Sequence, residues 1–375
     1  MKRFLKITIA LILTFALCVP ALAGPALPQE VLTRLQDNVL EYDEIPDLIG
    51  TYNPTVIANE IGRASQAENG RSAEATANRL ESMAQTYEDM AYQAEATSAT
   101  QAAAYLMQAE TLRTQAADHV NDYRTMELSS EKVRKDIIAE TKKLFLEYYR
   151  LGKQKVFGQQ ELDYLNRAYT SAVTRRRYGA GTEIEELTAL EALQKAQAAA
   201  VSMDASISAG YKRLITMCGW QYDSPAEIGP EPVPELSALV PADKDGDMAK
   251  ALEQSLTLRS DRVLYENAKR MGGTTEEKYR KQLENDTVTV RSAFVSAYDA
   301  LILKKSTYEA KAALYAVKAQ ELSVSAKQLS LGLISRMEYA AREYEVNSAR
   351  SASENAWYDL MEAKVDYDMA LDGAL

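Results

Sequence analysis

The chain has 375 residues, a formal net charge of −11 at pH 7 and a single histidine, His119. A surface this acidic disfavours nucleic acid and anionic lipid surfaces as partners. A single histidine excludes metal sites and proton relays that need two or more histidines, and His119 lies in a polar stretch where it is expected to be solvated. The sequence also has no phosphate-binding loop and no GxGxxG motif, so we predict no catalysis, no metal and no other cofactor.

The first 23 residues are typical of an export signal. Three basic residues within the first six positions precede an apolar run at 7–19, and Ala21-Leu22-Ala23 fits a cleavage site. Because residues 1–23 hold no acidic residue, the mature chain carries a formal charge of −14. No later segment reaches the roughly 20 apolar residues of a transmembrane helix. We therefore expect an exported chain without a transmembrane helix after signal cleavage.

The positions of the ten prolines divide the mature chain. They lie before residue 55 and in a connector at 224–242, which leaves two long stretches rich in strong helix formers. Proline costs a helix interior about 3 kcal/mol, so long helices are expected where it is missing. We predict an all-α fold with a lead at 24–54, a first helical hairpin repeat at 55–223, the connector, and a second repeat at 243–375.

The first repeat begins with a stretch at 63–125 that is rich in alanine and poor in large apolar residues. Small side chains let helices pack closely but bury little area, so a slender extra hairpin is expected here. Asn69-Gly70 is the predicted break inside it. Ser129 or Ser130 is the predicted cap of the helix that follows.

Apolar residues recur at seven-residue spacing on both sides of two glycine-containing turns. The series around the turn at 178–181 are Ile137, Leu144 and Leu151, then Leu193, Ala200, Ile207 and Leu214. The series around the turn at 331–335 are Phe294, Leu301, Tyr308, Tyr315, Leu322 and Leu329, then Ala349, Ala356, Ala363 and Ala370. Such series predict elongated antiparallel coiled-coil hairpins, and the chain is therefore interpreted as two tandem repeats.

The two turns carry a recognisable pattern. The segments Arg177-Tyr-Gly-Ala-Gly-Thr182 and Leu329-Ser-Leu-Gly-Leu-Ile-Ser-Arg-Met-Glu338 resemble the paired hairpin tips of the TolC-like outer membrane efflux proteins. The second likeness extends to Tyr358-Asp-Leu-Met-Glu-Ala-Lys-Val-Asp-Tyr367 and to Leu371-Asp-Gly373. The resemblance covers most of the mature chain and is weakest between residues 62 and 122.

The resemblance implies a homotrimer in which each chain contributes two hairpins to a hollow helical cylinder. Its tips are expected to dock to a membrane fusion protein, and through it to an inner-membrane pump. By position, Gly181 and Gly332 are expected to reverse the chain. The expected docking surface is formed by Gly181, Thr182, Gly332, Leu333, Ile334 and Ser335.

Glu338 is implied as a residue of the pore constriction, since it lies six residues after Gly332. The corresponding position counted from Gly181 is Leu187, so this acidic feature is expected to be half missing, with Glu183, Glu185 and Glu186 as the residues that could compensate in the first repeat.

The sequence differs from the family where members that pierce the outer membrane insert two strands per repeat. A spanning strand needs about 9–11 residues of alternating character. The segments at 62–127 and 271–287 do not offer this pattern, so we expect a TolC-like protein without those strands, in the cell envelope but not spanning a membrane. The alternative function is an exported structural coiled coil that scaffolds or binds other envelope proteins.

Overall fold

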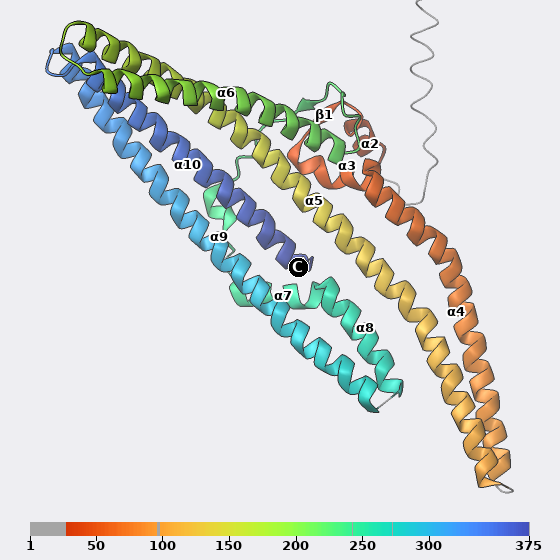
Figure 1. Cartoon of the computed structure of the whole chain (residues 1–375). Helices are drawn as coiled ribbons and strands as arrows, with labels where there is room; N and C mark the ends of the chain where they lie inside the picture. Colours follow the sequence, from red (N-terminus) through yellow and green to blue (C-terminus); the bar gives the residue numbers. More distant parts are fainter. Residues whose placement is uncertain (1–27, 96–97, 242, 272, 375) are drawn as a thin grey trace, which may run out of the picture.

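The computed structural model describes residues 28–374 except 96–97, 242 and 272. The predicted signal at 1–23 lies outside the described residues. The described chain is elongated and almost wholly helical (Figure 1). This confirms the all-α fold class and the arrangement of long antiparallel helices.

The elements follow the chain in two similar halves joined by the connector. The first half holds α2 (Gln29–Arg34), β1 (Val39–Leu40), the 3-10 turn η1 (Tyr42–Glu44), α3 (Ile45–Tyr52), α4 (Pro54–Glu95), α5 (Ala99–Arg177) and α6 (Glu183–Met217). The rest holds β2 (Glu227–Ile228), the 3-10 turn η2 (Leu236–Leu239), α7 (Lys244–Gln254), α8 (Leu256–Met271), α9 (Gly273–Ser330) and α10 (Arg336–Leu371).

The longest helix, α5, has 79 residues and is therefore about 120 Å long at about 1.5 Å per residue. The hairpins α5–α6 and α9–α10 turn at the same end of the molecule (Figure 1). The hairpins α4–α5 and α8–α9 reach toward the opposite end. The first of these is much the longer, because α4 has 42 residues and α8 has 16.

In both halves, a glycine that follows the last helix packs against the end of an earlier helix, at the middle of the molecule. Gly219, after α6, lies against the end of α3, where a Cβ would come within 2.1 Å of the Tyr52 carbonyl oxygen. Gly373, after α10, lies against the end of α7, where a Cβ would come within 2.2 Å of the Gln254 carbonyl oxygen. Only glycine permits these approaches. The shared contact is independent support for two tandem repeats.

The core lies in this middle region, where the lead and the connector pack on the long helices. Val39 and Leu40 of β1 pair in parallel with Glu227 and Ile228 of β2, which ties the lead to the connector. The rings of Tyr358 and Tyr367 on α10 are fully buried. Their hydroxyls donate to Glu231 Oε1 at 2.7 Å and to Asp247 Oδ2 at 2.5 Å, so each buried phenol has a carboxylate partner.

Two local predictions in the first half were wrong. Asn69-Gly70 lies inside α4, and Ser129 and Ser130 lie inside α5. One glycine costs a helix only about 1 kcal/mol, and α4 packs along α5, which offsets that cost. The cap of α5 is Ser98, whose side-chain oxygen accepts from the Gln101 N–H at 3.4 Å. The side chain of His119, on α5, lies outside the described part of the chain.

Candidate functional site

The turn between α5 and α6, residues 178–182, is called the first tip. Gly179 reverses the chain with φ of +72°, a conformation that costs other residues about 1–2 kcal/mol. The N–H of Ala180 donates to the Arg175 carbonyl at 2.8 Å, which satisfies a carbonyl at the end of α5. Thr182 then caps α6, with Glu185 completing a capping box.

The turn between α9 and α10, residues 331–335, is called the second tip and repeats that geometry. Gly332 has φ of +70°, and the N–H of Leu333 donates to the Gln328 carbonyl at 2.9 Å. Ser335 caps α10, accepting from the Glu338 N–H at 3.1 Å while Glu338 Oε2 accepts from the Ser335 N–H at 2.7 Å. Both tips are thus rigid, locally encoded reversals.

The shared geometry corrects the alignment that the sequence suggested. The residue that reverses the first tip is Gly179, whereas Gly181 does not have a positive φ. Gly332 therefore corresponds to Gly179, and Glu338 corresponds to Glu185 as the third residue of each capping box. The predicted match of Glu338 with Leu187 was wrong, and both repeats hold the acidic group.

The carboxylate of Glu338 is fully exposed and held by its cap. Its pKa is lowered, first by the backbone N–H of Ser335, then by the side-chain hydrogen bond with Ser335. Arg342 lowers it further through its positive charge. Glu338 is therefore ionised near neutral pH and fixed in position at the start of α10.

The side chains of the two tips differ in character. Beside the first tip, Arg176 at the end of α5 pairs with Glu186 at 3.0 Å, and Arg175 pairs with Glu185 at 3.5 Å. Both tips also expose apolar side chains: Tyr178 of the first tip is 79% exposed, and Leu331 and Leu333 of the second tip are 73% and 70% exposed. Thr182 and Ser335 are exposed on the two tips, and Ile334 is half-buried. The tips lie beside one another at one end of the molecule (Figure 1).

The two hairpins are joined along α5 and α10. Arg150 Nη2 donates to Glu362 Oε1 at 2.6 Å near the middle of the molecule. Closer to the tips, the Tyr344 hydroxyl donates to Glu161 at 2.9 Å, and its ring stacks on Tyr164 with centroids 4.6 Å apart. Because α6 packs on α5 and α9 packs on α10, the helices form one layer in the order α6, α5, α10, α9. The layer is an open wall with two free edges.

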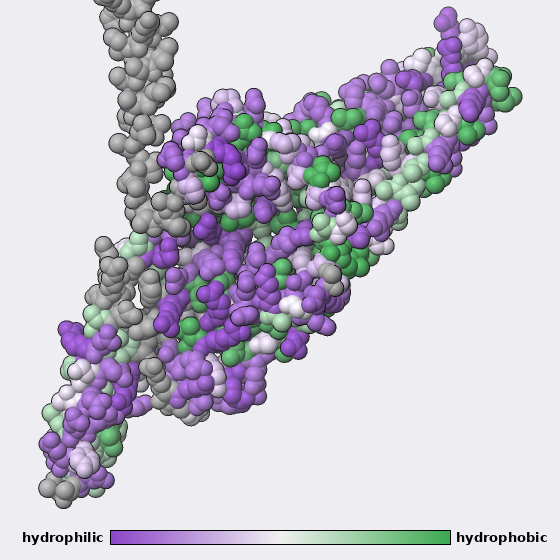
Figure 2. Space-filling model, turned by 180° about the vertical axis from the view of Figure 1, so that it is seen from behind, coloured by the Kyte–Doolittle hydropathy of each residue, from purple (hydrophilic) through white to green (hydrophobic). Residues whose placement is uncertain are grey.

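The free edge on α9 carries an apolar series that the sequence reasoning missed. Each member lies two residues after a member of the series Leu301 to Leu329, which faces α10. Two residues correspond to a rotation of about 200° around the helix axis, so the second series faces away from α10. Its exposed members are Leu303, Ala310, Val317, Val324 and Leu331. Figure 2 shows hydrophobic side chains along this edge of the arm that leads to the tips. The sequence does contain a signal for this edge: a second apolar series at seven-residue spacing, displaced by two residues from the series that faces α10.

The free edge on α6 is rich in small residues between 198 and 209, and the same helix also exposes Ile184, Leu187 and Val201. Leu193 and Leu214 bury their side chains against the wall. The opposite, exposed face carries Ala198, Ala199, Ser202, Ala205, Ser206 and Ala209. Small residues allow a neighbouring helix to approach closely.

Several solved protein structures are similar to this fold. No family model and no curated protein matches this sequence. The structure is similar to a membrane protein from Pseudomonas aeruginosa, with a TM-score of 0.59 at 12% identity over 88% of this chain and 93% of that one. It is also similar to the outer membrane protein VceC from Vibrio cholerae, with a TM-score of 0.58 at 10% identity over 88% and 96%.

A further counterpart is the MtrE outer membrane channel of Neisseria gonorrhoeae in its open state. The TM-score is 0.58 at 11% identity, over 89% of each chain. These likenesses show that the chain has the TolC-like fold, as the tip motifs predicted. Among the described residues, no helix is both long and apolar enough to cross a membrane.

Proposed function

We propose that the exported chain assembles as a trimer into a hollow helical conduit for efflux or secretion in the cell envelope. The observation that carries this proposal is the open wall with two unlike free edges. The apolar edge on α9 would pack against the edge on α6 of the next copy, where small residues let two helices approach closely. Contacts of this head-to-tail kind generate closed rings when the rotation between copies closes.

The tips are proposed to dock end-on to a membrane fusion protein, which is in turn coupled to an inner-membrane pump. The docking residues are Gly181, Thr182, Gly332, Leu333, Ile334 and Ser335, together with the exposed Leu331 and the arginines beside the first tip. Exposed leucines at a fixed turn are costly in water unless a partner covers them. The second tip exposes two such leucines beside its glycine and the first tip exposes the single ring of Tyr178, so we assign the larger apolar contact to the second tip.

Glu338 is proposed to line the narrow end of the conduit with Glu185 as its counterpart. Three chains would then place six carboxylates at the same height, one from each capping box. Such a ring disfavours anions and attracts cations at the entrance. Opening would move the tip helices apart and separate these charges.

The test is to measure the mass of the mature protein in solution and its capture by a fusion protein encoded beside it. We expect a trimer that is retained by the fusion protein. Replacement of Val317 and Val324 by aspartate should give a folded monomer, because it places charges on the edge that meets α6. A wild-type monomer that ignores the fusion protein would overturn the proposal.

The second candidate is an exported structural coiled coil that binds other envelope proteins. The observation in its favour is the long α4–α5 hairpin, which exposes Tyr92 at 81% and Met107 at 73%. A bulky residue at Gly332 separates the candidates. Transport should fail if the chain is a conduit, and little should change if the α4–α5 hairpin is the functional element.

A further inference from the structure

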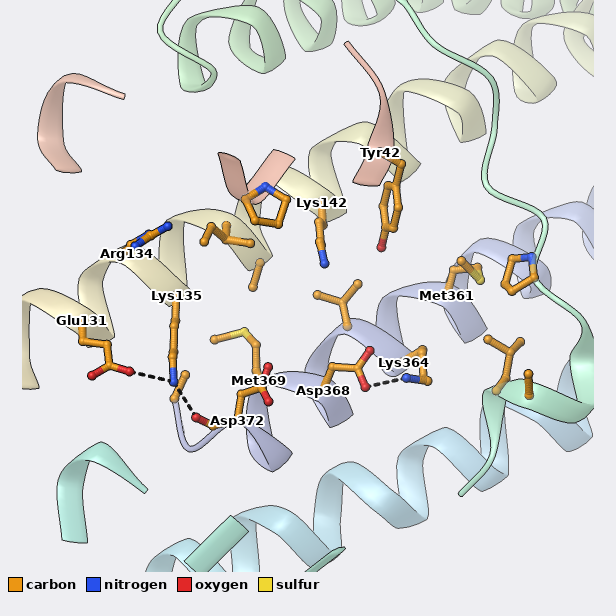
Figure 3. Close-up of a pocket in the computed structure, with 18 residues that line it drawn as sticks. Tyr42, Glu131, Arg134, Lys135, Lys142, Met361, Lys364, Asp368, Met369 and Asp372 are labelled. Atoms are coloured by element: carbon orange, nitrogen blue, oxygen red, sulfur yellow. Dashed lines mark hydrogen bonds and ion pairs between the residues drawn. The ribbon is translucent and has the colours of Figure 1, made fainter. Parts of the chain in front are cut away.

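A cavity of about 640 Å³ lies in the middle region, where the lead and the connector cover the seam between α5 and α10 (Figure 3). This volume falls within the range of about 300–1,000 Å³ found for small-molecule sites. The cavity is remote from both tips and from the free edges of the wall. Its walls come from both repeats, with α5 from the first and α10 from the second.

The walls of the cavity are mainly apolar. The apolar residues that line it are Pro46, Ile138, Ala139, Pro234, Ala238, Leu239, Met361, Val365, Met369 and Ala374. Two methionines among them are flexible enough to adapt to an irregular apolar ligand. A surface of this kind binds hydrocarbon, so a small free anion alone would leave most of it in contact with water.

Two lysines at the cavity are already engaged by carboxylates. Lys135 pairs with Glu131 at 3.1 Å and also donates to the carbonyl of Asp372 at 2.7 Å (Figure 3). Lys364 pairs with Asp368 at 2.5 Å. These pairs satisfy Glu131 and Asp368. The third carboxylate of the lining, on Asp372, is exposed to solvent and forms no ion pair within the described part of the chain.

Three other polar groups at the cavity have no such partner among the described residues. Lys142 lies over the ring of Tyr42, with Nζ 5.5 Å from its centroid, and makes no ion pair. Arg134 also makes no ion pair, and the Tyr42 hydroxyl donates no hydrogen bond within the described chain. Burial, then Asp368 and Asp43, raise the pKa of Tyr42, so its hydroxyl keeps its proton as a donor. Figure 3 shows Lys142 and Tyr42 directed into the same space.

We propose that this cavity binds a single-chain amphiphile with an anionic head, such as a fatty acid or an alkyl phosphate. The head accepts from Lys142 Nζ and the Tyr42 hydroxyl, with Arg134 at the rim, and the hydrocarbon tail lies along Ile138, Met361 and the other apolar residues. Lys142, Arg134 and the Tyr42 hydroxyl all donate, and the one unpaired carboxylate, on Asp372, is exposed to solvent, which favours an anionic head over a cationic or sugar head.

The ligand would act as a bridge between the two repeats. It would contact α5, α10, the lead and η2 of the connector at once. A ligand that binds only the folded state stabilises it in proportion to the logarithm of its concentration above Kd. Occupancy would therefore hold the two hairpins in one relative arrangement.

The test uses the mature protein and decanoate below its micellar concentration, measured by titration calorimetry. One site per chain is expected, with decyl phosphate binding comparably and decyltrimethylammonium at least tenfold more weakly. Equal binding of the cation would overturn the anionic assignment. Inorganic phosphate that binds as tightly as decanoate would overturn the role of the tail, and no binding of any probe would overturn the site.

Variants locate the site. Lys142→Met should weaken decanoate binding at least tenfold, Tyr42→Phe should weaken it less, and Ala238→Trp should block it by filling the cavity from an exposed position. Lys155→Met is the matched control, since Lys155 is also on α5 but pairs with Asp204 away from the cavity. Circular dichroism verifies folding. Unchanged binding in both Lys142→Met and Ala238→Trp would place the ligand elsewhere and contradict the proposal.

Discussion

The first and second tips end their helices with the same hydrogen bonds and begin the next helices with the same capping box, yet they expose different chemistry. Gly179 and Gly332 have φ values of +72° and +70°. Tyr178 and Ala180 flank the first glycine, next to arginines of α5 that pair with glutamates, whereas Leu331 and Leu333 flank the second. The same backbone geometry at a tip is therefore compatible with different exposed side chains.

This comparison teaches how a duplicated hairpin can diverge. A glycine at the reversal, a hydroxyl residue three positions later and a glutamate three positions after that suffice for the shared turn. The remaining positions face solvent and are free to differ. We infer that the reversal serves the fold and that the differing side chains serve partner recognition, which gives four tests.

The largest effect is expected from Leu331→Asp combined with Leu333→Asp. A leucine that becomes fully buried contributes about 1.5–3 kcal/mol, so losing two should weaken capture by the fusion protein at least about 100-fold. The matched change at the first tip, Tyr178→Asp with Ala180→Asp, should weaken it far less. Surface-immobilised fusion protein measures both, and equal losses would contradict the assignment of the apolar anchor to the second tip.

Next in size are Gly179→Leu and Gly332→Leu. Each should destabilise its tip by about 1–2 kcal/mol, since a side chain is strained at positive φ. The two losses should be equal, because a Cβ at either position meets nothing within 4 Å. Hydrogen exchange of the tip amides measures them. The control Gly152→Ala, in open space on α5, should stabilise by about 0.5–1 kcal/mol, and unequal losses at the tips would argue against a shared backbone.

A smaller effect is expected from removing the caps. Thr182→Ala and Ser335→Ala should each cost about 1 kcal/mol, read from the exchange of the first-turn amides of α6 and α10. The lowered pKa of Glu338 means that its contribution is present above the ordinary value of 4.5 and is lost as the pH falls through the folded value. Glu338→Gln should remove this pH response at the second tip, and a response that persists would assign it to another group.

The smallest effect is expected from Arg176→Gln. Arg176 is exposed, and its pairs with Glu186 and Glu183 are weakened by salt. The variant should destabilise the first tip only slightly, and the difference from wild type should vanish at high salt. The second tip, which lacks such pairs, should show no salt dependence in the same exchange experiment. A large, salt-resistant loss would mean that Arg176 supports the fold.

The fold was predictable from local rules because coiled-coil spacing and glycine turns act over short sequence distances. The seven-residue series gave the seams, and the turn motifs gave the resemblance to TolC-like proteins. The exact reversal residue was not predictable, because Gly179 and Gly181 both offer glycine and only the hydrogen bond from Ala180 to Arg175 selects the first. The break after α4 was also missed, since packing against α5 outweighs the weak local signal at Asn69-Gly70.

The edges of the wall and the cavity were beyond sequence reasoning for another reason. The series through Val317 and Val324 is visible in the sequence, but whether it faces α10 or solvent depends on which series α10 covers. The cavity depends on contacts between segments far apart in the chain, such as Tyr42, Lys142 and Met361. Such contacts follow from tertiary packing alone.

The most direct test of the central claim is cross-linking between the two free edges. Val317→Cys and Ala198→Cys in one mature chain, treated with a bis-maleimide, should give a ladder that ends at three chains, while the native Cys218 is buried and unreactive. Val317→Cys alone should give no cross-link, because α9 would meet α6 and not itself. A dimer from Val317→Cys alone, or no cross-link from the double variant, would contradict a ring built from unlike edges.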